Sequence, residues 1–288
     1  MSLENLKPND VALIGIRSDA NSSFLRGAAA APEFIRRSMH SGSSNLCSEL
    51  GVELAGNSRF VDVGDRLVAD DPESFLAIEA EIEQITTRGA LPLVLGGDHA
   101  VTYPVFRAIN RANGRVNILH FDAHPDLYDD YEGNPWSHAS PFARIMENGL
   151  AGRLVQVGIR TLNQGQRLQV ERFGVEVHEM SNFDIDKIGR DFDGPVYISL
   201  DIDALDPAHA PGVSHHEPGG LSVRDVLTIV QRLPNPIVGA DIVEYNPDRD
   251  INGMTAMVAA KLIKEFAGRM LLNSPAANVN SPGSGWTR

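Results

Sequence analysis

The sequence predicts an α/β protein in which helices cover both faces of a parallel sheet. Short aliphatic runs alternate with segments of helical period along most of the 288-residue chain. Several of these runs are almost continuously apolar, as is typical of strands that are buried on both faces. No internal repeat or low-complexity linker divides the chain, so we expect a single domain over residues 1–273.

Eight of the apolar runs are predicted to be strands. In chain order they lie near Val11–Ile16, Arg59–Val63, Pro92–Leu95, Asn117–Phe121, Leu154–Ile159, Gly174–His178, Val196–Asp201 and Ile237–Val243.

Six segments between or after these strands have helical period. Pro32, Pro72 and Pro141 fall where helices are predicted to begin, a position that tolerates the missing N–H of proline. Residues 274–288 are rich in Pro, Gly, Ser and Asn, so we expect an irregular tail there. The predicted helices are Pro32–Met39, Pro72–Arg88, Tyr103–Asn113, Pro141–Asn148, Val223–Leu233 and Met254–Ala267.

The composition argues against several classes of protein. With 38 acidic and 25 basic residues, the formal charge of −13 should repel nucleic acid and anionic membranes. The chain contains no apolar run long enough to span a bilayer, and it does not begin with a basic segment followed by an apolar stretch, so we expect a cytoplasmic location. Cys47 is the only cysteine, so a metal site must use oxygen and imidazole ligands.

Acidic and histidine residues follow three of the predicted strands. The third strand leads into Gly96-Gly97-Asp98-His99, the fourth into Asp122-Ala123-His124-Pro125-Asp126, and the seventh into Asp201-Ile202-Asp203. Open α/β sheets bind ligands at the carboxyl ends of their strands. Residues i and i+2 of an extended chain share a face, so each of these segments can direct two side chains into one site.

Such a concentration of carboxylates requires compensating cations. Four aspartates in one small volume would repel each other by several kcal/mol in a medium of low dielectric constant. A single histidine after a strand is more often structural, and a single aspartate is often a helix cap. Together, the three segments predict two divalent metal ions, and mixed Asp and His ligands favour Mn²⁺ and related ions over Ca²⁺ or Mg²⁺.

These segments resemble the signature sequences of the ureohydrolases, the family of arginases and agmatinases. The matching strings are Gly-Gly-Asp-His-Ala, Phe-Asp-Ala-His-Pro-Asp and Ser-Leu-Asp-Ile-Asp-Ala-Leu-Asp-Pro. The resemblance extends over almost the whole chain and is strongest to arginases of the plant type. It implies a three-layer α/β/α fold with an eight-stranded parallel sheet, two Mn²⁺ ions (with Ni²⁺ or Co²⁺ as alternatives) and a hydroxide that bridges them.

The resemblance also implies which residues bind each metal. Asp122 and Asp201 would bridge the two ions. The first ion would be bound in addition by His99 and Asp126, and the second by His124 and Asp203. Asp126 would also orient the hydroxide.

Two further residues are predicted to act on the substrate. Glu244 follows the eighth strand, and its carboxylate could accept paired hydrogen bonds from a planar guanidinium. His138 matches the family histidine that moves a proton to the leaving amine or binds the substrate. Near it, Asn134 and Ser137, with Asn21, Ser22 and Ser23 of the first loop, are neutral hydrogen-bonding residues that could bind a substrate carboxylate.

Other polar residues are expected to be structural. His215 and His216 are adjacent, so at most one of them could line the site. His209 is expected to form a hydrogen bond within its loop, and Asp206 to stabilise a turn before Pro207.

The sequence therefore predicts a hydrolase that cleaves a cationic guanidino compound to urea and an amine. Arginine is slightly favoured over agmatine, while guanidine, guanidinobutyrate and formimidoylglutamate remain alternatives. A catalytically silent binding protein would be expected to lack a ligand or Glu244, and a deacetylase-like enzyme with one metal would not need both His99 and Asp126. The resemblance also implies a homo-oligomer, a trimer or a hexamer.

Overall fold

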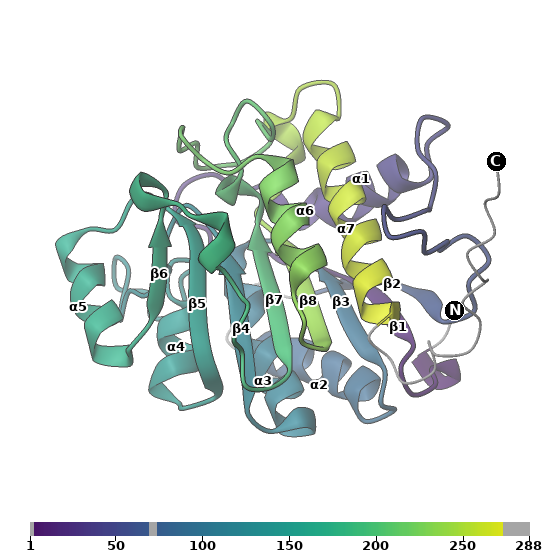
Figure 1. Ribbon diagram of the computed structural model, residues 1–288, viewed down its shortest axis with the longest axis horizontal. Coiled ribbons are helices and arrows are strands. Elements are labelled where there is room, and N and C mark those ends of the chain that lie inside the picture. The colour runs from purple at the N-terminus through teal and green to yellow at the C-terminus, as the bar shows by residue number, and fades with distance from the viewer. Residues whose placement is uncertain (1–2, 69–73, 273–288) are drawn as a thin grey trace.

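The computed structural model describes residues 3–68 and 74–272, in which eight strands form one sheet (Figure 1). Every neighbouring pair of strands is parallel. The strands are β1 Val11–Arg17, β2 Phe60–Leu67, β3 Leu91–Leu95, β4 Val116–Phe121, β5 Ala151–Ile159, β6 Glu176–Glu179, β7 Val196–Asp201 and β8 Ile237–Val243.

The order of the strands in the sheet is β2-β1-β3-β8-β7-β4-β5-β6. The last two strands of the chain therefore occupy the centre of the sheet, between β3 and β4. Because all strands are parallel, the carboxyl ends of β3, β8, β7 and β4 lie side by side at one edge. This is the edge at which the sequence predicts the metal ligands.

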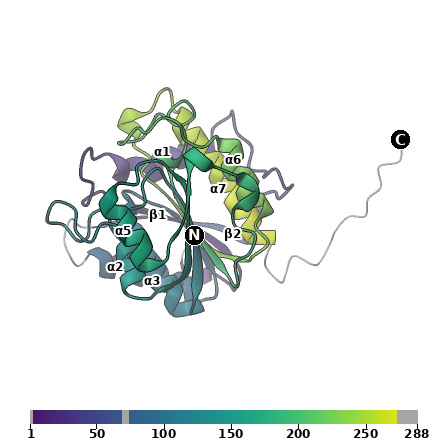
Figure 2. The ribbon, with the colours of Figure 1, turned by 60° about the vertical axis from the view of Figure 1, so that its left-hand side comes forward.

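Helices form one layer on each face of the sheet, and these layers are separated in Figure 2. Buried residues of α1, α6 and α7 pack on one face, and those of α2, α3 and α4 pack on the other. No helix of the described residues combines the length and apolar character needed to cross a membrane. The helices are α1 Ala31–Met39, α2 Ser74–Thr86, α3 Thr102–Asn113, α4 Pro141–Glu147, α5 Gln164–Phe173, α6 Val223–Arg232 and α7 Met254–Leu272.

The three-layer α/β/α fold is confirmed, and the elements differ from the predicted ones in a few places. Helix α5 was not predicted, because most of its residues are polar and Leu168 is exposed. Gly174, which was assigned to the sixth strand, instead ends α5 in the left-handed conformation. Pro72 and the tail at 274–288, together with the boundary of the predicted domain, lie outside the described residues.

Helix α7 continues five residues beyond its predicted end at Ala267, through a glycine. A Cβ atom on Gly268 would lie 2.7 Å from the Ser48 hydroxyl oxygen, so the glycine serves the close approach of a neighbouring loop. Beyond it, Arg269 is buried and donates hydrogen bonds to the carbonyl oxygens of Val230 and Leu233 at the end of α6. The glycine therefore does not end the helix.

Gly97 allows two chain segments to meet beneath the predicted site. A Cβ atom at this position would lie 1.5 Å from the Ser18 carbonyl oxygen, which also accepts a hydrogen bond from the Asp98 N–H. Gly97→Ala must therefore displace backbone, and we expect it to lower the free energy of unfolding by about 3 kcal/mol or more. Gly42→Ala is the control, because nothing lies within 4 Å of a Cβ there. Denaturant unfolding of both variants measures the difference, and equal stabilities would contradict the packing described.

Candidate metal centre and active site

The predicted metal ligands come together at the ends of β3, β4 and β7. Asp201 is the last residue of β7, and Asp122 follows β4 directly. Phe121 pairs with Leu200 in the sheet, so the two aspartates continue from paired positions. His99 begins a short 3-10 helix after β3, where the Asp98 carboxylate caps the helix by accepting a hydrogen bond from the Ala100 N–H.

His99 directs one ring nitrogen into a group of carboxylates. Its Nδ1 atom lies 3.2 Å from Asp122 Oδ2, 3.1 Å from Asp126 Oδ2 and 3.3 Å from Asp201 Oδ2. This nitrogen is buried, yet none of these contacts has hydrogen-bond geometry, and it has no other hydrogen-bond partner among the described residues. A buried nitrogen that faces three carboxylate oxygens in this way is suited to bind a cation.

His124 forms a second group on the other side of Asp122. Its Nδ1 atom lies 3.3 Å from Asp122 Oδ1 and 3.1 Å from Asp203 Oδ2. The two oxygens of Asp122 therefore face different histidines. The set Asp122, His124 and Asp203 has donor atoms close enough together to hold one metal ion.

The carboxylates of this site are buried and repel one another, and both effects shift their pKa values. Burial, together with Asp203 and Asp122, raises the pKa of Asp201 well above its usual range. Burial and the Asp122 charge raise the pKa of Asp126 to about 6. Neighbouring carboxylates also outweigh the effect of burial on His124 and raise its pKa. Divalent cations would remove these conflicts, so the donor set fits the metal-dependent chemistry predicted from the sequence.

Glu244 and His138 form a pair beside the carboxylate group. Glu244 Oε1 lies 2.7 Å from His138 Nδ1 and accepts a hydrogen bond from the His99 N–H. Its other oxygen, Oε2, is buried without a hydrogen-bond partner in the part of the chain that the structure describes. Glu244 also has a positive φ of 62°, an unusual conformation that turns the chain at the end of β8.

The charges of this pair shift each other's pKa. Burial lowers the pKa of His138, but Glu244, with Asp126 and Asp98, outweighs burial and raises it to about 9. Burial likewise opposes the charged form of Glu244, and His138 lowers the pKa of that carboxyl below its ordinary value. On its other side, His138 Nε2 lies 2.8 Å from the Ser23 hydroxyl oxygen.

These residues open into a cavity of about 200 Å³. Its volume suits a small polar molecule, and its walls combine metal-ligand candidates with the Glu244–His138 pair. The lining includes His124, Asp126, Asp201, Asp203, His138 and Glu244.

The remaining predicted substrate residues lie around this cavity or next to it. Ser23 lines the cavity. Asn134 and Asn21 instead line a larger neighbouring cavity of about 490 Å³, and they form a hydrogen bond to each other. Ser137 is buried, and its hydroxyl accepts a hydrogen bond from the Ala139 N–H. The substrate-binding roles of Asn134 and Ser137 remain predictions.

Of the polar residues that were expected to be structural, His215 lines the cavity and the others lie in loops or turns outside its lining. His215 lines the cavity, while His216 is exposed and bonds to the Pro211 carbonyl oxygen, so only one of the pair faces the site. The Asp206 carboxylate accepts hydrogen bonds from three backbone N–H groups, as expected of a turn residue. The backbone N–H of His209 bonds within the same turn.

A row of buried polar side chains beneath the site was not predicted. Asp241 of β8 pairs with Ser199 of β7, Ser199 with His120 of β4, and His120 with Gln156 of β5. Each is a polar residue inside an otherwise mostly apolar strand. That interruption is the signal in the sequence that could have identified them.

Comparison with known proteins shows relatives along most of the chain. The mitochondrial arginase 1 of Arabidopsis thaliana is 51% identical over 276 residues, which cover 90% of this chain and 80% of that protein. A guanidinopropionase of Pseudomonas aeruginosa is 36% identical over 89% of this chain and 85% of its own length. The structure of a Medicago truncatula arginase superposes with a TM-score of 0.86 at 46% identity, covering 91% of this chain and 87% of that chain.

These relatives correct the expected cytoplasmic location. The arginases of Arabidopsis thaliana and Medicago truncatula are both named as mitochondrial proteins, so the expectation of a cytoplasmic location is not upheld. The expectation rested on the absence of membrane-spanning and secretory features, and such features do not distinguish the cytoplasm from the interior of an organelle.

The family itself follows from the extent of the match. A sequence model of the arginase family matches residues 9–268, a range that includes every predicted metal ligand, His138 and Glu244. The chain belongs to the arginase family.

Proposed function

We propose that the protein is a metal-dependent hydrolase that cleaves a guanidino compound to urea and an amine. The observation that carries this proposal is the Oε2 atom of Glu244, which is buried beside the clustered metal-ligand candidates and has no hydrogen-bond partner among the described residues. A guanidinium presents parallel N–H donors, and a carboxylate is its complementary acceptor. Glu244 would therefore fix both the position and the plane of the substrate group.

The metal requirement is proposed to be two Mn²⁺ ions. His99 and Asp126 would bind one ion and His124 and Asp203 the other, with Asp122 and Asp201 shared between them. The opposite orientation of the two Asp122 oxygens, toward His99 and His124, supports the shared role. When bound, such ions lower the pKa of a coordinated water and so supply a nucleophile near neutral pH.

The side chains then have distinct tasks in the reaction. Asp126 would accept a hydrogen bond from the attacking water and orient its lone pair toward the guanidinium carbon. As the C–N bond breaks, the leaving nitrogen needs a proton, because a protonated amine leaves far more easily. His138 would deliver that proton, and the Glu244 carboxylate beside its Nδ1 favours the protonated form of the ring.

The substrate is proposed to be arginine. Two relatives named as arginases, from Arabidopsis thaliana and Medicago truncatula, are 51% and 49% identical to this chain, whereas the guanidinopropionase is 36% identical. Arginine and agmatine share the guanidinium that Glu244 would bind, and they differ in a carboxylate several bonds away. Ser23, beside His138 in the cavity wall, is a neutral hydrogen-bonding group suited to such a carboxylate.

Steady-state urea assays on arginine, agmatine, 4-guanidinobutyrate and guanidine test the proposal. We expect arginine to be hydrolysed and kcat/KM for agmatine to lie within a few tens-fold of it, a difference of roughly 2 kcal/mol. Formimidoylglutamate, which yields formamide rather than urea, should not be cleaved. Efficient turnover of agmatine, 4-guanidinobutyrate or guanidine without activity on arginine would overturn the choice of substrate. If none of the four guanidino compounds yields urea, the proposed reaction is wrong.

A further inference from the structure

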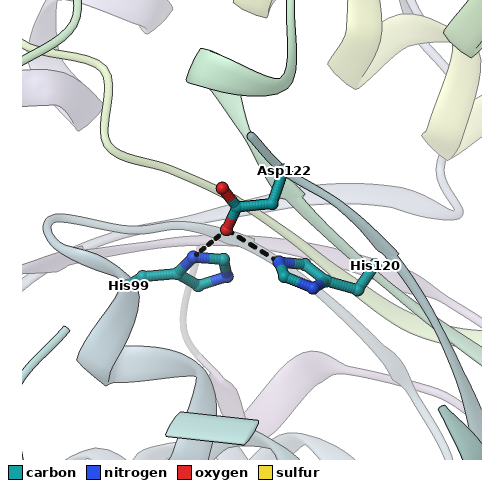
Figure 3. A group of neighbouring side chains, drawn as sticks. All are labelled: His99, His120 and Asp122. Carbon is teal, nitrogen blue, oxygen red and sulfur yellow. Dashed lines mark hydrogen bonds and ion pairs between the residues drawn. The ribbon is translucent and has the colours of Figure 1, made fainter. Parts of the chain in front are cut away.

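Figure 3 shows three side chains, His99, His120 and Asp122, that meet as a metal site would. Their donor atoms all lie within 4.8 Å of one another, and each of the three side chains is buried. Both histidines contact the same oxygen of Asp122, at 3.2 Å from His99 Nδ1 and 2.9 Å from His120 Nε2. His120 is not among the predicted metal ligands. Its hydrogen bonds show whether it could act as one.

Gln156 determines which nitrogen of His120 carries the proton. The Gln156 amide nitrogen lies 2.7 Å from the Pro125 carbonyl oxygen, which can only accept, so the amide must present its N–H groups on this side. The same nitrogen lies 3.0 Å from His120 Nδ1. That ring atom is therefore an acceptor, and the proton of the neutral ring lies on Nε2. The Nε2–H then donates to Asp122 Oδ2.

The same reasoning places the proton of His99 on the nitrogen that faces away from Asp122. The Ser199 hydroxyl donates to Asp241 Oδ1 at 2.7 Å, and it lies 2.9 Å from His99 Nε2. A hydroxyl has one proton, so Ser199 must accept from His99 Nε2–H, which leaves the lone pair of the neutral ring on Nδ1. His99 thus directs that lone pair among the carboxylates, where it could bind a cation, whereas His120 directs an N–H toward Asp122 and has no lone pair there.

We infer that His120 is not a metal ligand but a positioning residue that holds the carboxylate of Asp122 through a hydrogen bond and is itself fixed by Gln156. This inference rests on the proposed metal centre. Asp122 is the residue proposed to be shared by both ions, so the orientation of its carboxylate affects both positions. Gln156 acts at a second point as well, because its bond to Pro125 restrains the segment that leads into Asp126.

The packing around His120 supports a fixed ring. The side chain is fully buried, and its ring centroid lies 3.9 Å from that of Phe142. Gln156 is also buried and is the direct partner of His120 in the β4–β5 pairing. The Nε2–H donor of His120 is therefore held in place by the pairing of His120 with Gln156 and by the contact with Phe142. It needs no rearrangement when a cation binds.

Two substitutions of His120 separate the hydrogen bond from the packing. The amide nitrogen of His120→Gln can occupy the place of Nε2 and donate to Asp122, whereas His120→Met fills the space without a donor. We expect His120→Met and Gln156→Leu to weaken Mn²⁺ binding by about 10–100-fold, and His120→Gln to stay close to wild type. His178→Met, on the edge strand β6, is the control and should bind Mn²⁺ normally.

The measurements are Mn²⁺ titrations, metal-edge X-ray absorption and histidine ¹⁵N NMR of the metal-free protein, with thermal unfolding to identify misfolded variants. We expect one imidazole per ion in wild type and in His120→Gln, and a proton on His120 Nε2. Normal Mn²⁺ affinity in His120→Met, equal losses in both His120 variants, an additional imidazole that His120→Gln removes, or a proton on Nδ1 would each overturn the inference. Wild-type protein that binds no Mn²⁺ but has the Nε2 proton would overturn the proposed metal centre and leave the positioning network in place.

Discussion

Asp122→Ala should bind neither metal ion and release no measurable urea. The two oxygens of Asp122 face His99 Nδ1 and His124 Nδ1 at 3.2 and 3.3 Å, so the substitution removes a ligand from both proposed positions. We expect a loss of several kcal/mol of transition-state stabilisation, about 10³-fold or more in rate. Asp201→Ala should behave in the same way, whereas His99→Ala should mainly empty one position.

Elemental analysis after Mn²⁺ loading, together with urea assays, measures both effects. Wild-type protein should contain two ions per chain, chelation should abolish urea release, and added Mn²⁺ should restore it. Asp191→Ala is a matched control, because this aspartate is exposed and its carboxylate pairs with Arg153 at the surface. One ion or none in the loaded wild type would contradict the binuclear centre, and two ions in Asp122→Ala would contradict the shared ligand.

Glu244→Gln should retain both metal ions and lose most of its activity. The amide oxygen can still accept the His99 N–H that Glu244 Oε1 accepts now, so we expect the local fold to persist. The substitution removes the negative charge opposite the guanidinium and one acceptor for its N–H donors. By analogy with the loss of other buried hydrogen-bonding groups in active sites, we expect kcat/KM to fall by about 10²–10³-fold.

Glu217→Gln is the control for this experiment. Glu217 also lines the cavity, but its carboxylate belongs to neither proposed ion position, and its backbone oxygen bonds to Arg160. Its substitution removes one charge from the cavity wall and should change kcat/KM only a few-fold. If Glu244→Gln keeps near-normal kcat/KM with arginine, Glu244 does not bind the guanidinium.

The sequence was sufficient for the existence of the eight strands and for the residues that follow β3, β4 and β7, although β2 continues to Leu67, beyond its predicted end at Val63. Where an apolar run is followed directly by a polar motif, the boundary marks the end of the strand. Because parallel strands share one carboxyl edge, the polar side chains that follow them lie at the same edge of the sheet. Helix α5 was missed because it has little apolar periodicity, although Asn163 at its start and Gly174 at its end are ordinary capping residues.

The contacts among the polar residues beneath the site could not be predicted, because they depend on strand order. His120 and Gln156 become partners only when β4 and β5 are adjacent, and Ser199 reaches His99 only across the sheet. The separate role of each ring nitrogen depends on these contacts. A strand pattern alone gives the identity of such residues but not their neighbours.

The central position of the last two strands has a consequence for how the chain acquires activity. Before β7 and β8 are inserted, no strand connects β3 to β4 in the sheet, and the halves β2-β1-β3 and β4-β5-β6 are separate ribbons. Contacts between residues far apart in sequence slow folding, and the growing chain has to expose the inner edges of both ribbons until synthesis is nearly complete. High-affinity Mn²⁺ uptake would then report the closure of the sheet, so a nascent chain that ends before β7 should remain metal-free and dependent on chaperones.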